Sequence, residues 1–182
     1  MDAIKLLKAD HRTVEKLFKA YEAAGDRAFA TKAKLVESMI SELSVHASIE
    51  EMVFYPAARR SARQTTSMVL ESLEEHLGAK RLLADLEKME PKDERFNAKV
   101  TVLMEQIRHH VSEEEEDLFP AVADALSEER LKELGEALES AKATAPTRPH
   151  PHASDTPPGN AVTGLVAGAV DRTKDVIKGA MP

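Results

Sequence analysis

The chain has 182 residues, a formal net charge of −7 and no cysteine. The lack of cysteine excludes disulfides, iron–sulfur clusters, thiolate zinc sites and cysteine nucleophiles. The acidic balance argues against a nucleic-acid-binding surface, which needs clustered Lys and Arg. Aromatic residues make up 4% of the chain and Trp is absent, a composition that favours a helical bundle over a β-rich fold.

Five helical segments are predicted before residue 143 from the three- and four-residue spacing of apolar side chains. Gly25 fits the position after the first helix, Pro56 is expected to end or kink the second, and Ser127 is a good N-cap for the fifth. The third should stop at Pro91 and the fourth near Pro120. The segments run over residues 2–25, 26–60, 65–90, 93–120 and 128–142.

The chain after residue 142 is expected to lie outside this helical unit. Residues 145–159 read APTRPHPHASDTPPG, which offers almost no large apolar side chain, so we predict a disordered linker. Residues 160–178 show helical spacing that several glycines weaken, so they could form a docking helix or simply a flexible tail. We therefore divide the chain into a domain at 1–142 and a Pro-rich linker with a flexible, weakly helical tail at 143–182.

Membrane and export signals are not recognised in the sequence. The run of small and apolar residues at 161–170 is far below the roughly 20 needed to span a bilayer. The N-terminus lacks the apolar core of a signal peptide. We expect a mature chain that begins at or near Met1, works in the cytoplasm and binds neither membrane nor nucleic acid.

The chain repeats itself. Each half has a helix with one His, then a helix with His-x-x-x-Glu that leads to an aromatic–Pro pair. The matching pieces are Asp10-His11 with Glu75-His76, at an offset of 65, and His46 to Pro56 with His110 to Pro120, at an offset of 64. Two such hairpins predict an all-α fold, an up-down four-helix bundle built from a duplicated helical hairpin, with the short fifth helix added.

Polar residues on the inward seams of these helices predict a metal site. Residues four apart share a helix face, so a His and the Glu one turn later can aim a ring nitrogen and a carboxylate at one point. Buried carboxylates without partners are costly, and a bound metal would satisfy them. The candidate ligands are His11, His46, Glu50, His76, His110 and Glu114. As a working assignment, His11 and His46 hold one ion, His76 and His110 hold the other, and the two carboxylates bridge.

Two positions break the symmetry between the halves. Glu15 follows His11 by four residues, whereas the second half has Lys80 at the equivalent position after His76. Glu15 is therefore a candidate extra ligand, with a solvent-facing position as the alternative. Lys80 could neutralise a carboxylate, bind an anion or reach solvent. Mixed imidazole and carboxylate ligands suit iron, manganese or zinc.

At these residues the sequence resembles the hemerythrin-like, HHE cation-binding family over about residues 1–142. The resemblance implies a bundle that holds a non-haem centre of two iron ions with an oxo or hydroxo bridge, and it implies the same six ligands. Oxygen-carrying hemerythrins have a second His one turn after the first on the third helix. Here that position is Lys80, a departure that argues against reversible O₂ carriage.

The resemblance also frames the expected function, since related bacterial proteins are linked to peroxide, nitric oxide or iron handling. The leading hypothesis is a di-iron protein that binds and reacts with O₂ or H₂O₂, protects against oxidative stress and has catalase-like activity. The alternative is a sensor of O₂, NO or iron, or an iron-handling protein without turnover. Tyr55 is interpreted as core or helix-end packing, with a redox-active role as the alternative. Glu75 and His109 are interpreted as groups that orient ligands or face the surface.

Overall fold

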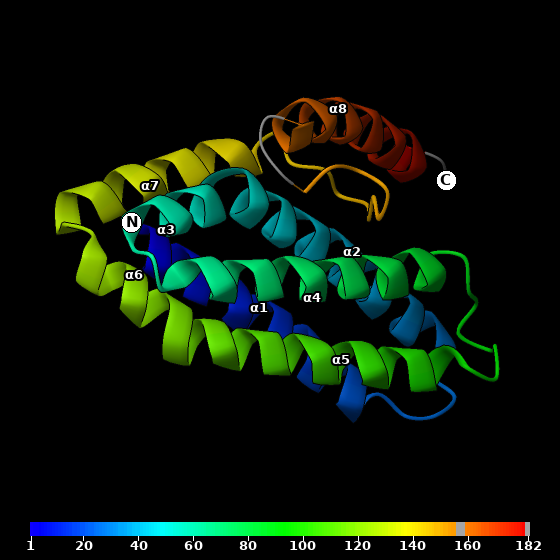
Figure 1. The fold of residues 1–182 in the computed structure, drawn as a ribbon. Coiled ribbons are helices and arrows are strands. Elements are labelled where there is room, and N and C mark those ends of the chain that lie inside the picture. The colour runs from blue at the N-terminus through cyan, green and yellow to red at the C-terminus, as the bar shows by residue number, and fades with distance from the viewer. Residues whose placement is uncertain (156–158, 181–182) are drawn as a thin grey trace.

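The computed structural model describes residues 1–155 and 159–180. Within them, a bundle of long helices is formed by α1 (Ala3–Ala23), α2 (Phe29–Ile49), α4 (Thr65–Leu86) and α5 (Phe96–Glu113) (Figure 1). Helix α1 pairs with α2 and α4 pairs with α5, so each half of the repeated sequence forms one hairpin. Helix α7 (Glu128–Lys142) packs on α1 and α2. The predicted all-α four-helix bundle with a short fifth helix is confirmed.

The helix ends follow local chemistry. The carboxylate of Asp2 accepts the backbone N–H of Lys5 at the start of α1, and the Ser127 hydroxyl accepts that of Arg130 at the start of α7, as expected for N-caps. Helix α4 ends at Leu86, five residues before the proline that was expected to stop it. The chain then returns through turns to the start of α5.

The apolar core consists of two clusters, with a layer of buried polar side chains between them. One cluster contains Leu7, Phe54 and Phe119, and the other contains Phe18 and Phe96. Full burial of each such side chain contributes about 1.5–3 kcal/mol to folding. The polar layer is thereby closed off from solvent at both ends of the bundle, which sets the conditions at the site described below.

Neither Pro56 nor Pro120 ends its helix, which corrects the prediction that the fourth helix stops near Pro120. In each half the helix passes into a π-helical turn and then continues as a short helix with the proline in its first turn. The Tyr55 N–H bonds the Glu50 carbonyl, five residues back. The wider turn shifts the hydrogen-bond register just before the proline, so the chain continues where a regular α-helix would break. These elements are η1 (Glu50–Phe54), α3 (Tyr55–Ser61), η2 (Glu114–Leu118) and α6 (Phe119–Ala125).

The chain beyond α7 packs on the bundle over the part that the structure describes, which differs from the expected disordered linker and corresponds to the docking-helix alternative for residues 160–178. Helix α8 (Gly159–Ala180) lies on the outside of the bundle and contacts η1 (Figure 1). Its Gly168 lies against the Thr144 carbonyl so closely that a Cβ would clash there. Arg148 in the preceding segment bonds the Asp175 carboxylate at 2.6 Å. The composition argument counted apolar side chains, whereas polar bonds and close glycine packing hold this segment.

The expected boundary at residue 142 stays a prediction, and residues 156–158 of the proposed linker lie outside the described residues. A search of the described helices finds none that is both long enough and apolar enough to cross a membrane.

Candidate metal centre

Side chains from α1, α2, α4 and α5 and from the two π-turns meet in the middle of the bundle. The Nε2 atoms of His11 and His46 are 3.2 Å apart, and those of His76 and His110 are 3.1 Å apart. Every one of these rings is at most 5% exposed. The structure therefore brings the four predicted histidines together as the two pairs of the working assignment.

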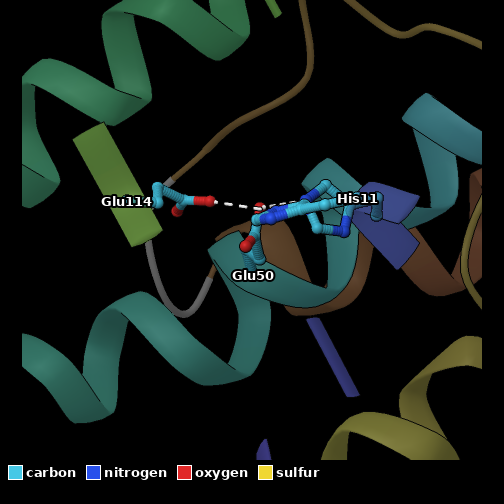
Figure 2. Close-up of side chains that lie close together, drawn as sticks. His11, Glu50 and Glu114 are labelled. Carbon is cyan, nitrogen blue, oxygen red and sulfur yellow. Dashed lines mark hydrogen bonds and ion pairs between the residues drawn. The ribbon is translucent and has the colours of Figure 1, made fainter. Parts of the chain in front are cut away.

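Glu50 and Glu114 each reach both pairs of histidines. The Oε2 atom of Glu50 lies 3.1 Å from the Nε2 atom of His46 and 3.4 Å from that of His76. The Oε2 atom of Glu114 lies 3.3 Å from the Nε2 atom of His11 and 3.6 Å from that of His110. Figure 2 shows the Glu114 carboxylate directed at His11, with Glu50 beside them. Each carboxylate therefore lies between the two pairs of histidines.

A second layer of carboxylates faces the outer nitrogen of each ring. The Nδ1 atom of His11 lies 2.8 Å from a carboxylate oxygen of Glu115, and that of His76 lies 3.0 Å from one of Glu51. The Nδ1 atom of His110 lies 2.7 Å from a carboxylate oxygen of Glu75, and that of His46 lies 3.7 Å from one of Asp10. Each partner is the chain neighbour of a predicted ligand, so the repeated Asp/Glu–His and Glu–Glu doublets supply both layers.

This second layer fixes which ring nitrogen can bind a cation. A carboxylate at Nδ1 favours the tautomer in which Nδ1–H donates to it, as in many metal sites. In that tautomer the Nε2 lone pairs of His11, His76 and His110 point inward, whereas Nδ1 of His46, 3.7 Å from Asp10, makes no hydrogen bond that selects its tautomer. Neither carboxylate oxygen of Glu50 has a hydrogen-bond partner, nor does Oε2 of Glu114. Buried acceptors rarely stay unsatisfied, so the donor set fits cations.

Two groups of potential ligands share Glu50. One joins His11, His46, Glu50 and Glu114, the other joins Glu50, His76 and His110, and within each group the ligand atoms lie within 4.8 Å of one another. A further group of this kind lies at the surface and consists of Glu75, His109 and Glu113. The two buried groups lie side by side and share Glu50, so each could hold a metal ion.

Burial and neighbouring charges set the protonation of the two inner carboxylates. Burial raises the pKa of Glu50 well above its usual value, and the charge of Glu114 raises it further. Burial also acts to raise the pKa of Glu114, but the imidazoles of His110 and His11 outweigh it and lower that pKa. Burial lowers the pKa of His46 to about 4, so its ring is a neutral ligand at pH 7. A bound cation would replace the proton that Glu50 otherwise holds.

Tyr55 lies against the centre, whereas the sequence interpretation favoured packing and kept a redox-active role only as the alternative. Its hydroxyl donates to Oε1 of Glu114 at 2.9 Å and lies 3.2 Å from the Nε2 atom of His76. Burial raises the pKa of this phenol well above 10, with the charge of Glu114 adding to the effect. The signal lay in the repeat: Tyr55 matches Phe119 at the offset of 64, so only one half has a hydroxyl there.

Glu15, the seventh predicted ligand, is not part of the cluster. Its carboxylate accepts bonds from Nε and Nη2 of Arg108, at 3.0 and 3.1 Å, on the outside between α1 and α5. Lys80 neutralises a carboxylate, one of its predicted alternatives, because its Nζ atom bonds both oxygens of Glu51 at 2.6 and 2.7 Å. The residue that breaks the symmetry of the two halves thus supports His76 through Glu51.

Known proteins resemble this chain in sequence and in fold. Residues 2–122 match the family described as the hemerythrin HHE cation binding domain. An uncharacterized hemerythrin-like protein of Schizosaccharomyces pombe is 29% identical over 170 residues, which are 93% of this chain and 83% of that protein. A DNA nickase of Nostoc is 28% identical over 145 residues, 78% of this chain but 39% of the nickase.

A crystal structure gives the same picture for the fold. The hemerythrin HHE cation binding domain-containing protein of Mycobacterium kansasii superposes with a TM-score of 0.67 at 22% identity, covering 79% of this chain and 86% of that one.

The match to the yeast protein leaves out 12 of the 182 residues. It must therefore include most of the 40 residues from 143 onward, so the similarity extends into the segment that carries α8.

Proposed function

Because the chain belongs to the family of hemerythrin HHE cation-binding domains, we propose that it is a non-haem di-iron protein that reacts with O₂ or peroxide. We propose catalase-like decomposition of H₂O₂ as its activity, with oxidative-stress protection in the cytoplasm as its role. The observation that carries the proposal is the inward set of four imidazole Nε2 atoms together with three carboxylate oxygens that lack a hydrogen-bond partner, both of Glu50 and Oε2 of Glu114. Two redox-active ions at such a centre can together exchange the two electrons that peroxide chemistry needs.

Different residues of this chain would bind the ions, orient the ligands and exclude water. His11 and His46 would hold one ion and His76 and His110 the other, with Glu50 and Glu114 between them. The outer carboxylates keep the imidazoles of His11, His76 and His110 in the tautomer that binds a cation. The two apolar clusters exclude bulk water and strengthen every charge interaction inside the layer.

Tyr55 gives the two ions different surroundings. Its hydroxyl holds a proton between Glu114 and the His76 side of the centre, where it can donate to an oxygen atom of a bound ligand or bind directly as phenolate. Disproportionation, 2 H₂O₂ → O₂ + 2 H₂O, requires protons to pass from one peroxide to the other. Tyr55 is a buried O–H group at the centre that could carry such a proton.

Iron is proposed over manganese and zinc from the family rather than from the ligands, which would accept all three. The proposal is tested with protein purified without chelators, by metal analysis, visible absorption and O₂ release from H₂O₂. We expect about two irons per chain, a charge-transfer band and O₂ release above that of free iron. One ion per chain, or iron-loaded protein that releases no O₂, would contradict the proposal.

A sensor of O₂, NO or iron is the second candidate, favoured by the contacts of α8. The Asn160 amide donates to the backbone carbonyl of Glu51 at 2.8 Å, and Arg172 donates to the carbonyl of Lys142 at 2.8 Å. Glu51 faces His76, and Lys142 pairs with Asp10, which faces His46. Two positions on α8, one at its start and one in its second half, thus contact residues that support the histidines. Hydrogen exchange of residues 159–180 that does not change on reduction or NO binding would exclude sensing through α8.

A further inference from the structure

A groove on the surface opens directly beside the centre. It lies between α1 and α5 and has a volume of about 490 Å³. A smaller cavity of about 20 Å³ lies inside the bundle, against all four histidines. Four residues line both hollows: His11, Val14, Ile107 and Val111. The groove and the inner cavity are therefore separated by one layer of side chains.

That layer is apolar except for the His11 ring. Val14 is 3% exposed and Ile107 is 6% exposed, and Val111 is partly buried at the groove side. Moving an ion through such a layer means stripping its water without replacement, which costs several kcal/mol or more. Small uncharged molecules carry a far smaller penalty, and a cavity of this size holds about one water-sized molecule.

The rim of the groove is charged, and three of its charged residues, Glu15, Arg108 and Glu115, form ion pairs. Arg108 bonds Glu15 through two nitrogens and also bonds Glu22 at 2.7 Å. Glu115 accepts from Nδ1 of His11 and lies 3.4 Å from the Nζ atom of Lys8. Glu15, which the sequence singled out as a ligand, thus has a different place, as part of the ion-paired rim of the groove.

We propose that this groove and the layer of Val14, Ile107 and Val111 form the access route by which small uncharged molecules, of the size of O₂, NO or H₂O₂, reach the His11 side of the centre. This inference rests on the proposed function and specifies which molecules can reach that site. On the opposite side, the cavity beneath α8 is lined by Lys80 and Glu51, whose ion pair lies between it and His76.

The route is first tested in metal-free protein, where iron chemistry plays no part. The chain has two tyrosines and no Trp, so in a Tyr21→Phe background the fluorescence reports Tyr55 alone. We expect dissolved O₂ to quench it and iodide, an anion, to leave it unquenched. Val111→Phe should lower the O₂ quenching constant at least threefold and Val111→Ala should raise it. Val102→Phe, on an exposed face of the same helix, is the matched control and should change nothing.

The second readout is the rate at which NO binds the Fe(II)-loaded protein in a stopped-flow experiment. Val111→Phe should slow binding at least threefold, with iron content unchanged, and Val102→Phe should not. If Val111→Phe and Val111→Ala both leave O₂ quenching unchanged, or if iodide quenches as well as O₂, the route is wrong whatever the activity. If the quenching results hold while the iron-loaded protein releases no O₂ from peroxide, the route stands and catalase-like turnover fails.

Discussion

Replacing Glu50 by Gln should stabilise the protein when no metal is bound. Glu50 is fully buried, neither of its carboxylate oxygens has a hydrogen-bond partner, and burial raises its pKa well above 4.5. A Gln amide could donate to the Nε2 lone pair of His46, now 3.1 Å from the carboxylate. Relief of one unsatisfied buried group is worth about 2 kcal/mol, or about 4–8 °C in Tm for a chain of this size.

The stabilisation should depend on pH in one direction. Below pH 4.5 the Glu50 carboxyl is protonated in both the folded and the unfolded chain, so its burial adds no pH-dependent penalty. Above pH 4.5 the unfolded chain releases this proton while the folded chain still holds it, so the penalty grows with pH. The advantage of the Glu50→Gln variant should therefore be larger at pH 7.5 than at pH 4.5.

The assay is thermal unfolding of chelator-treated wild type and Glu50→Gln at both pH values, with Glu42→Gln on the exposed face of α2 as control. Metal affinity should move the opposite way and fall by more than the about 10–100-fold typical of outer-layer substitutions. A variant that is no more stable than wild type at pH 7.5, or that binds metal equally well, would refute the assignment of Glu50 as a buried ligand.

Three further substitutions probe the supports of the centre. Lys80→Met leaves Glu51 without its lysine in a mostly buried pair and should lower the free energy of unfolding by about 3 kcal/mol, measured in urea; an effect below about 0.5 kcal/mol, the size expected of a surface pair, would contradict this. Tyr55→Phe removes the donor to Glu114 and should cost about 1–3 kcal/mol and shift the visible band of the iron-loaded protein; an unchanged spectrum would mean that the phenol does not act at the iron. Gly168→Ala should displace α8, because a Cβ there would meet the Thr144 carbonyl, and should raise hydrogen exchange of residues 159–180; Gly25→Ala, which meets open space, should not.

Periodicity and the repeat were enough to predict the bundle and the six side chains that meet at its centre. Apolar spacing identifies the inward face of each helix. The few polar residues on that face lie close together because the four faces pack against one another. The sequence could not place Glu15, because a residue four positions after a ligand can turn toward a neighbouring helix as easily as toward the centre. Only the tertiary structure reveals Arg108 as its partner.

For Tyr55 and for the chain after residue 142, the sequence could not decide between the alternatives, for different reasons. An aromatic residue before a proline commonly packs at a helix end, and the π-turn that rotates Tyr55 toward the centre has no simple sequence signature. The segment after residue 142 was interpreted from its lack of large apolar side chains. Close packing at Gly168 and bonds such as that from Arg148 to Asp175 leave no trace in such a composition.

Because of the π-turn, the number of residues between 50 and 56 determines whether the Tyr55 side chain points toward the centre, and the lengths of the loops do not. A residue added to a helix advances its phase by about 100°, and each turn of this kind accommodates one more residue than a regular turn. Loss of a single residue between Glu50 and Tyr55 would restore a regular helix and swing the phenol away from Glu114. A relative with a one-residue alignment gap here could therefore keep all four histidines and both inner carboxylates, yet have a centre that is chemically symmetric.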